Sequence, residues 1–312
     1  MSHGTPSLST ILDASVPVLG NRELLEAVAI TRGRPILALV LGPRTLDSAC
    51  IPHLYDVLGT IGSGAFDLFL GPLGPAVAEV GRVAGLLADH GRFDALVPFE
   101  ASPAATLLAF AAERIWMGPA ATLAPLLAAD APDATARALL ELLAHAPSDT
   151  RPAALSRWWG DLDPRILGQS VRLRRDLEAL ARRCLEVGGQ AAPAAAVQRF
   201  TAVEGPDLPL ISAECLALGL PIHSPGPGLY RALVGLHRYY VRMLELEGEM
   251  TWRQHRYAVA YEAFIDTPSE RRILLRITRA DDHGRPLRDG PTVWRWVRPS
   301  GREIAIDQVM EL

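Results

Sequence analysis

The stretch Phe93–Pro125, FDALVPFEASPAATLLAFAAERIWMGPAATLAP, decides the fold class of this chain. Its apolar run Ala95–Phe99 predicts a short strand, and a turn separates that strand from an Ala/Leu-rich helix expected at Pro103–Glu113. A second strand is expected at Arg114–Met117, before a turn punctuated by proline. A strand, a helix and a strand at this spacing form a right-handed unit whose strands are parallel. The stretch therefore predicts an α/β protein.

The residues before this stretch repeat the same alternation. Apolar runs predict buried strands at Ile36–Leu41 and Phe66–Leu70. A helix is expected after each strand, at Ser48–Ile61 and, beyond a tight turn, at Pro75–Asp89. We therefore expect a mostly parallel sheet with helices packed on it.

The chain after Pro125 changes character. Pro164–Val187 has the pattern of a long amphipathic helix with an Arg-rich face, and Gly188-Gly189 ends it. A further helix, Leu229–Leu246, leads into apolar segments separated by turn signals. These segments predict a small antiparallel meander of about four strands: Tyr257–Ile265, Arg271–Arg279, Thr292–Arg298 and Glu303–Ile306. The predicted parts of the chain are an N-terminal arm (1–34, with a helix at Arg22–Ile30), a domain of repeated βα units (35–228) and the C-terminal helix plus meander (229–312).

Composition limits the function classes. The chain has 312 residues, 49% of them hydrophobic and 21% charged, with a net charge of −4. This is a globular profile with no overall attraction to nucleic acid or anionic membranes. It has no apolar run of roughly 18 residues and no basic segment near Met1, so we expect no membrane span and no secretory signal. The cysteines Cys50, Cys184 and Cys215 lie far apart with no CxxC, which favours a cytoplasmic location and no metal site.

The chain is lysine-free, so all 31 of its Lys+Arg residues are arginine. A GC-rich genome would explain this, and the single asparagine, Asn21, agrees. Avoidance of a lysine-targeted modification is the other explanation, and the sequence leaves both open. In either case lysine is excluded as a catalytic base.

Two segments carry a resemblance to a known family. The first segment lies within Phe93–Pro125. It matches the family pattern Val-Pro-x-x-Ala-x-Ser-Gly-Gly-Thr, which is followed in that family by Leu-Ile-Ala-Leu-Ala-Ala-Asp-Glu-Ile. Its matching residues are Val97, Pro98, Ala101, Thr106, Leu107, Ala109, Ala111, Ala112 and Ile115. The second, LPLISAECLALGLPI at 208–222, matches at Pro209, Glu214, Leu218, Gly219, Leu220 and Pro221. In these segments the chain resembles the serine dehydrogenase proteinases of the Clp/crotonase superfamily.

The resemblance covers roughly residues 36–228 and implies a Clp/crotonase-like core for residues 35–228. It also implies self-association, since proteins of this superfamily commonly form trimers or stacked rings. The region around Pro164–Val187 is helical in the family and helps to pack subunits together.

The family's catalytic positions are occupied by proline in this chain. Pro103 takes the place of the nucleophilic serine, and Ser102 lies one residue too early. Pro206 takes the place of the histidine, and Pro75 falls where a glycine N–H would bind the oxyanion. We therefore expect no catalytic residues and no cofactor. The resemblance then implies a catalytically silent, serine-protease-like protein that acts as an oligomeric scaffold.

Ser102 and Pro103 also have a structural interpretation. Proline is favoured at the first position of a helix, and serine at the N-cap just before it. We therefore expect the Ser102 oxygen to accept a hydrogen bond from the N–H of Ala104 or Ala105.

Two alternatives stay open. An active serine peptidase or hydrolase would use Ser102 as a displaced nucleophile, with a base chosen from His90, His145, His223 and His237. A subunit of a nucleic-acid, protein-modification or defence system would use the arginines and tryptophans of the meander: Arg271, Arg272, Arg276, Arg279, Trp294 and Trp296. We expect the meander to bind a protein partner, with nucleic acid the less favoured ligand. A crotonase-type acyl-CoA enzyme is disfavoured, because it too needs the N–H donor that Pro75 lacks.

Overall fold

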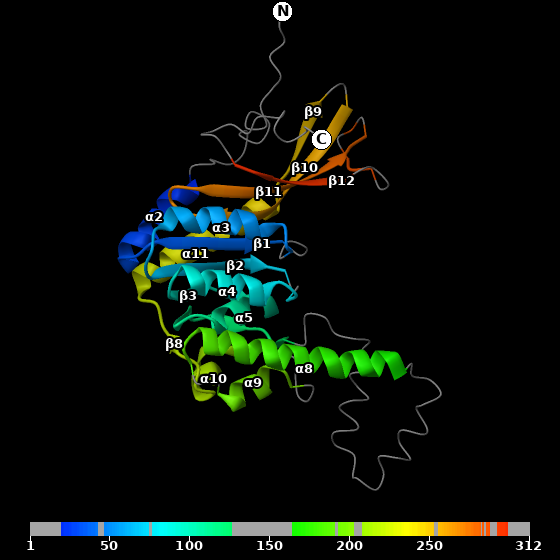
Figure 1. Ribbon diagram of the computed structural model, residues 1–312. Helices are drawn as coiled ribbons and strands as arrows, with labels where there is room; N and C mark the ends of the chain where they lie inside the picture. Colours follow the sequence, from blue (N-terminus) through cyan, green and yellow to red (C-terminus); the bar gives the residue numbers. More distant parts are fainter. Residues whose placement is uncertain are drawn as a thin grey trace, which may run out of the picture.

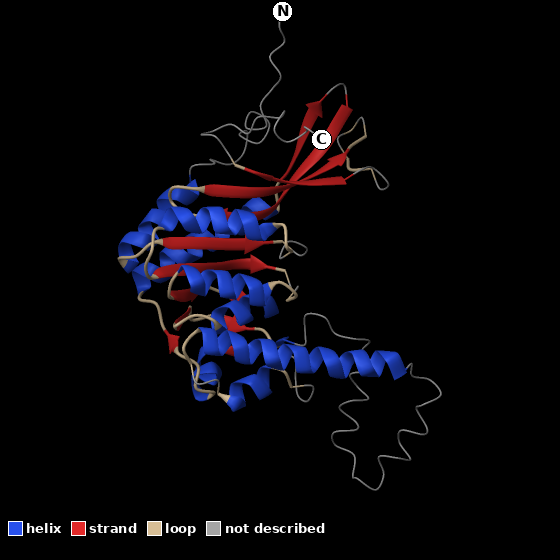
Figure 2. Ribbon diagram, viewed as in Figure 1, coloured by secondary structure: helices blue, strands red, loops and turns tan. Residues whose placement is uncertain are grey.

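The computed structural model describes residues 20–42, 47–74, 77–126, 164–190, 193–202, 208–252, 255–281, 283, 285–287 and 292–298. These residues form a mixed α/β fold built on one large sheet with helices on both faces (Figures 1 and 2). Within the described ranges the sheet has nine strands in the order β12-β11-β10-β1-β2-β3-β5-β8, and β9 pairs with β10.

The parallel half of the sheet follows the alternation predicted from the sequence. Its strands are β1 (Ile36–Leu41), β2 (Phe66–Leu73), β3 (Phe93–Val97), β5 (Arg114–Met117) and β8 (Ile222–His223). The helices between the first four are α3 (Cys50–Ile61), α4 (Val80–His90) and α5 (Pro103–Phe110). The predicted βα alternation from Ile36 to Met117 is therefore confirmed.

Each face of the sheet covers its own hydrophobic core. On β1, Leu37, Leu39 and Leu41 face the core shared with α3, α4 and α5. The alternate residues Ile36, Ala38 and Val40 face a second core, shared with α2 (Gly20–Arg32) and α11 (Pro227–Leu244). This alternation explains why β1 is apolar throughout, since a strand buried on both faces has no polar side. Outside α4 and α5 lies α8 (Pro164–Val187), followed by α9 (Ala194–Phe200) and α10 (Ser212–Ala217).

The C-terminal strands continue the same sheet. The predicted antiparallel pairing of β10 (His255–Asp266), β11 (Arg271–Arg279) and β12 (Thr292–Val297) is confirmed. The strand expected at Glu303–Ile306 lies outside the described residues. β10 also pairs antiparallel with β1, where Val40 lies opposite Phe264. The described residues after Gly228 therefore share one sheet and both cores with the parallel strands.

Several elements differ from the prediction. β3 begins and ends two residues earlier than the predicted Ala95–Phe99, and α4 begins at Val80 rather than at Pro75. β2 continues to Leu73 through the expected turn, because a register shift between Leu39 and Leu41 lets it stay paired with β1. α5 ends at Phe110, since the N–H of Glu113 already donates to Phe93 and brings the chain back into the sheet. β9 (Glu247–Trp252), which the sequence analysis missed, forms a hairpin with β10.

A small second sheet lies beside α5. It has the order β4-β6-β7, from β4 (Glu100–Ala101), β6 (Thr122–Leu123) and β7 (Leu210–Ile211). Leu123 pairs with Leu210 across β6 and β7. This sheet places the two segments that carry the family resemblance side by side.

Candidate functional site

Ser102 lies between β4 and α5, at the N-cap of the helix, with Pro103 at its first position. Its Oγ accepts a hydrogen bond from the N–H of Ala105 at 3.3 Å, so the predicted N-cap role is confirmed. The same hydroxyl donates to the carbonyl oxygen of Gly74, also at 3.3 Å. Both the proton and an acceptor lone pair of Ser102 are therefore bound by backbone groups.

Gly74 reaches Ser102 because β2 and β3 are neighbours. Parallel strands end at the same edge of a sheet, so the segment after β2 lies next to the segment after β3. These are the two segments in which the resemblance locates the oxyanion turn and the nucleophile. Pro75 and Pro206 lie outside the described residues, so what we infer for them rests on the sequence.

Two of the candidate histidines contact other groups. The Nε2 atom of His90, at the end of α4, lies 3.0 Å from the carbonyl oxygen of Gly62. His223, on β8, stacks on Trp116 with 5.3 Å between the ring centroids. The Ser102 hydroxyl is hydrogen-bonded to backbone groups and to neither ring.

His237, on α11, packs against Phe99 with ring centroids 4.7 Å apart. Burial lowers the pKa of His237, and its Nδ1 is buried with no hydrogen-bond partner. α11 and α5 cover opposite faces of the sheet, however, and a general base must lie within hydrogen-bond reach of its nucleophile. His145 lies outside the described residues. The described part of the chain thus brings no histidine into contact with Ser102.

The cysteines offer no substitute nucleophile. Burial is the main cause that raises the pKa of Cys50, Cys184 and Cys215 to about 12, so each remains a thiol at neutral pH. Among the described residues, no group of three or more His, Cys, Asp or Glu side chains comes together as metal ligands would.

The arginines of the meander are held by other side chains. Arg271 donates to Asp266, Arg272 pairs with Glu270 and Asp56, Arg276 donates to Glu262, and Arg279 contacts His255. Of the two tryptophans, Trp296 packs against the core and lies 5.0 Å from the ring of His53, while Trp294 is exposed. Among the described residues, the four arginines predicted to contact nucleic acid are therefore already in contact with other side chains of the protein.

A buried ionic cluster, which the sequence analysis missed, lies at the amino-terminal edge of the sheet. Arg32, the last residue of α2, donates to Asp67 and to Asp94 at 2.7 Å each, and both carboxylates are fully buried. The guanidinium carbon lies 4.1 Å from the centre of the Trp116 ring, whose Nε1 donates to Asp94. A signal was present in the sequence: Asp is the second residue of two buried strands, FDLFL and FDALV.

In this cluster, burial and ion pairing have opposite effects on the pKa values of Asp67 and Arg32. Burial raises the pKa of Asp67, although the hydrogen bond and charge of Arg32 act to lower it. Burial acts to lower the pKa of Arg32, but its bonds to both carboxylates outweigh that, and the net pKa is raised. The cluster ties α2 to the sheet.

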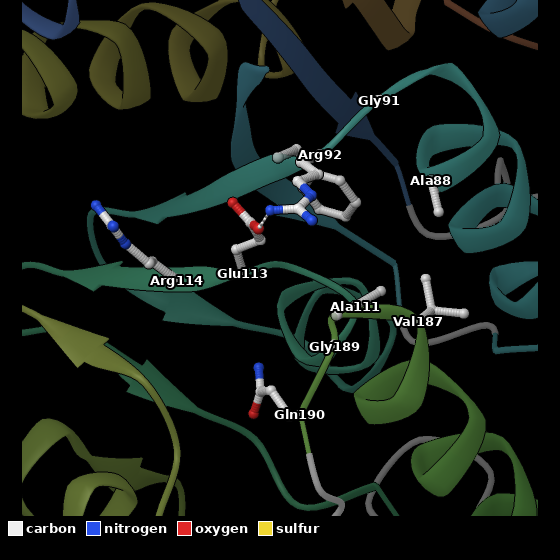
Figure 3. A pocket seen from close by; sticks show the side chains of 11 residues that line it. Ala88, Gly91, Arg92, Ala111, Glu113, Arg114, Val187, Gly189 and Gln190 are labelled. Atoms are coloured by element: carbon white, nitrogen blue, oxygen red, sulfur yellow. Dashed lines mark hydrogen bonds and ion pairs between the residues drawn. The ribbon is translucent and has the colours of Figure 1, made fainter. Parts of the chain in front are cut away.

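A cavity of about 510 Å³ lies at the far end of α5 from Ser102 (Figure 3). Its wall is built where α4, α5 and α8 end and where β3 and β5 begin. Its lining residues are Ala88, Gly91, Arg92, Phe93, Ala111, Glu113, Arg114, Val187, Gly188, Gly189 and Gln190. The cavity is thus separate from the position that catalysis would occupy in the resembled family.

No family model, no curated protein and no solved structure matches this chain. Of the helices that the structure describes, none combines the length and apolar character needed to cross a membrane.

Proposed function

We propose that this protein is a catalytically silent relative of the serine dehydrogenase proteinases, with a Clp/crotonase-like core that serves as an oligomeric scaffold. One observation carries the proposal. The Ser102 hydroxyl is bound in both directions by backbone groups, as acceptor from Ala105 and as donor to Gly74. A nucleophilic hydroxyl has to pass its proton to a base, whereas this one directs its proton to a carbonyl oxygen.

The arrangement of the resembling segments supports the family part of the proposal. Gly74 contacts Ser102, as an oxyanion turn and a nucleophile segment would. β6 pairs with β7, and β7 begins shortly after Pro206, the position of the family's histidine. In the resembled family, catalysis needs the oxyanion turn, the nucleophile segment and the histidine segment close together. In this chain the corresponding segments lie close together but lack the catalytic side chains.

Exposed apolar side chains support the scaffold part. Leu208, Ile211 and Leu216 are 64%, 52% and 60% exposed, and all three lie on or beside β7 and α10. Val171, in the first half of α8, is also exposed. Several exposed apolar residues within one short segment are typical of subunit contacts.

Fluorophosphonate labelling, read by intact mass, tests the loss of activity. We expect no adduct on the wild-type protein or on Ser102→Ala, under conditions that label a known serine hydrolase completely. Ser102→Ala should still lower the free energy of unfolding by about 1 kcal/mol, because it removes the N-cap of α5. A single adduct that disappears in Ser102→Ala would instead establish an active hydrolase with a displaced nucleophile.

Light scattering after size-exclusion chromatography tests self-association. We expect the mass of an oligomer, which is at least twice the 33.7 kDa of one chain. Leu216→Arg should shift the protein toward smaller species, because a charge in an apolar contact stays unpaired. Tyr55→Arg is the matched control, since Tyr55 is equally exposed but lies on α3. A monomeric wild-type protein would contradict the scaffold proposal.

A further inference from the structure

The outermost strand of the sheet, β12, has few contacts with the rest of the protein. It is the first strand in the order of the sheet, so among the described strands it pairs only with β11. Its Trp296, which lies opposite Leu274 of β11, packs against the core and against the ring of His53 on α3. His53 therefore links α3 directly to this edge strand.

The surroundings of the His53 ring suit its neutral form. The ring centroids of His53 and Trp296 are 5.0 Å apart, with 33° between the ring planes. The His53 side chain is partly buried, and its Nδ1 atom is buried with no hydrogen-bond partner. A neutral imidazole carries a proton on one nitrogen only, so Nδ1 can remain without one. A protonated imidazole has an N–H on both nitrogens, and the N–H on Nδ1 would then be buried without an acceptor.

Two charged side chains of opposite sign act on His53. Arg272, on β11, disfavours a positive charge on the ring, while Asp56, one turn further along α3, favours one. The two also face each other, with Nη2 of Arg272 3.4 Å from Oδ2 of Asp56. Glu270, in the turn before β11, pairs with Arg272 and with Arg298, which follows β12. Protonated His53 would therefore add a third positive charge beside Arg272 and Arg298.

Stacking on Trp296 acts in the opposite direction, because an aromatic face attracts a cation. That attraction is weak at a partly exposed site, whereas leaving a buried N–H without an acceptor costs more. Burial is the main cause that lowers the pKa of His53, and the charge of Arg272 is the second. The neutral ring is thus the form that fits against Trp296.

From these contacts we propose that protonation of His53 separates its ring from Trp296 and loosens β12, so that acid opens this edge of the sheet. A histidine that resists protonation in the closed form stabilises that form fully above the pKa of a free ring, about 6.5. The contribution is lost as the pH falls below that value. The contact is therefore closed at pH 7.5 and opens at lower pH. The proposal is independent of the scaffold function.

Opening would change the surface at the end of the sheet. Trp294 and Trp296 lie on the same face of β12, because they are two residues apart on one strand. Trp294 is already exposed, and loss of the His53 contact would expose Trp296 beside it. An edge strand with an exposed apolar face is the kind that pairs with another chain.

Hydrogen–deuterium exchange of the full-length protein, read by mass spectrometry on peptides that cover β12, tests the proposal. Rates are corrected for the intrinsic effect of pH on exchange. Between pH 7.5 and pH 5.5 we expect the opening constant of β12 to rise about threefold to tenfold. Tenfold is about the limit for a ring of pKa 6.5 that only the open form can protonate. Amides of β2, in the middle of the sheet, should show no such rise.

His53→Phe keeps an aromatic ring against Trp296 but cannot be protonated, so it should remove the rise. His53→Gln, which also cannot be protonated, should remove it without an aromatic ring. His223→Phe is the matched control, because His223 stacks on Trp116 at the opposite edge of the sheet, and it should leave the rise unchanged.

Three results would overturn the proposal. The first is a β12 opening constant that does not depend on pH in the wild-type protein. The second is a rise that persists in both His53→Phe and His53→Gln. The third is slower exchange of β12 at pH 5.5 in the wild type alone, since attraction between the protonated ring and Trp296 would then be the stronger effect.

Discussion

A chain that ends at Gly228 is expected not to fold. The truncation removes α11 and strands β9 to β12, and with them the antiparallel neighbour of β1. Of the nineteen described residues that are buried in the core under α2 and α11, twelve lie after Gly228. Losing most of one core exceeds the roughly 5–15 kcal/mol by which a folded protein is stable. Circular dichroism should therefore show no cooperative melting.

A buried polar network also joins α2, near the start of the described chain, to α11 and β10 after Gly228. The Asp266 carboxylate, on β10, accepts from Asn21 on α2 at 2.7 Å and from Tyr240 on α11 at 2.9 Å. Arg271 donates to the same oxygen at 3.2 Å. The truncation would leave Asn21 buried without its acceptor, or force α2 off the sheet.

The full-length variant Trp294→Ala is the control for the truncation. Trp294 lies on the last described strand and is about half exposed, so its loss should leave cooperative melting intact. If the truncated chain melted cooperatively and gave dispersed amide NMR signals, the C-terminal segment would be a separable module.

Arg32→Met is expected to destabilise the protein by about 3–5 kcal/mol, because removing one partner leaves buried charges uncompensated. In the variant, the remaining cation beside Asp67 and Asp94 among the described residues would be Arg34, whose nearest nitrogen is 3.6 Å and 3.4 Å from them. Urea unfolding at neutral pH measures the loss.

Arg22→Met is the matched control, because it makes the same substitution on the same helix. Arg22 forms an exposed pair with Glu26 at 2.8 Å, and its loss should cost at most about 0.5 kcal/mol. Adding Asp67→Asn and Asp94→Asn to Arg32→Met should recover part of the stability, since it removes the unpaired charges. If Arg32→Met cost no more than Arg22→Met, the cluster would not stabilise the fold.

The pH dependence of Arg32→Met gives a further check on the same charges. Burial already raises the pKa of Asp67, and loss of Arg32 removes an interaction that lowers it. A carboxyl with a folded-state pKa above its unfolded value of about 3.9 favours the folded state at low pH and loses that contribution as the pH rises. The difference in free energy of unfolding between wild type and Arg32→Met should therefore become smaller as the pH is lowered from 7 toward 5.

The sequence by itself determined the local structure. The bounds of β5, α8 and β11 were predicted correctly, because periodicity and the glycine pair at 188–189 mark them within a few residues. The N-cap role of Ser102 was equally predictable, since the oxygen and the N–H that it accepts from are three residues apart. Such features depend on neighbours in the chain, and a sequence displays those directly.

Only the tertiary structure decided which distant segments meet. The pairing of β10 with β1 joins residues more than 200 positions apart, so the meander extends the main sheet. The Ser102–Gly74 bond, the Arg32 cluster and the cavity between three helix ends likewise depend on the order of the strands. Local propensity does not encode that order, because it follows from burying both faces of one sheet at once.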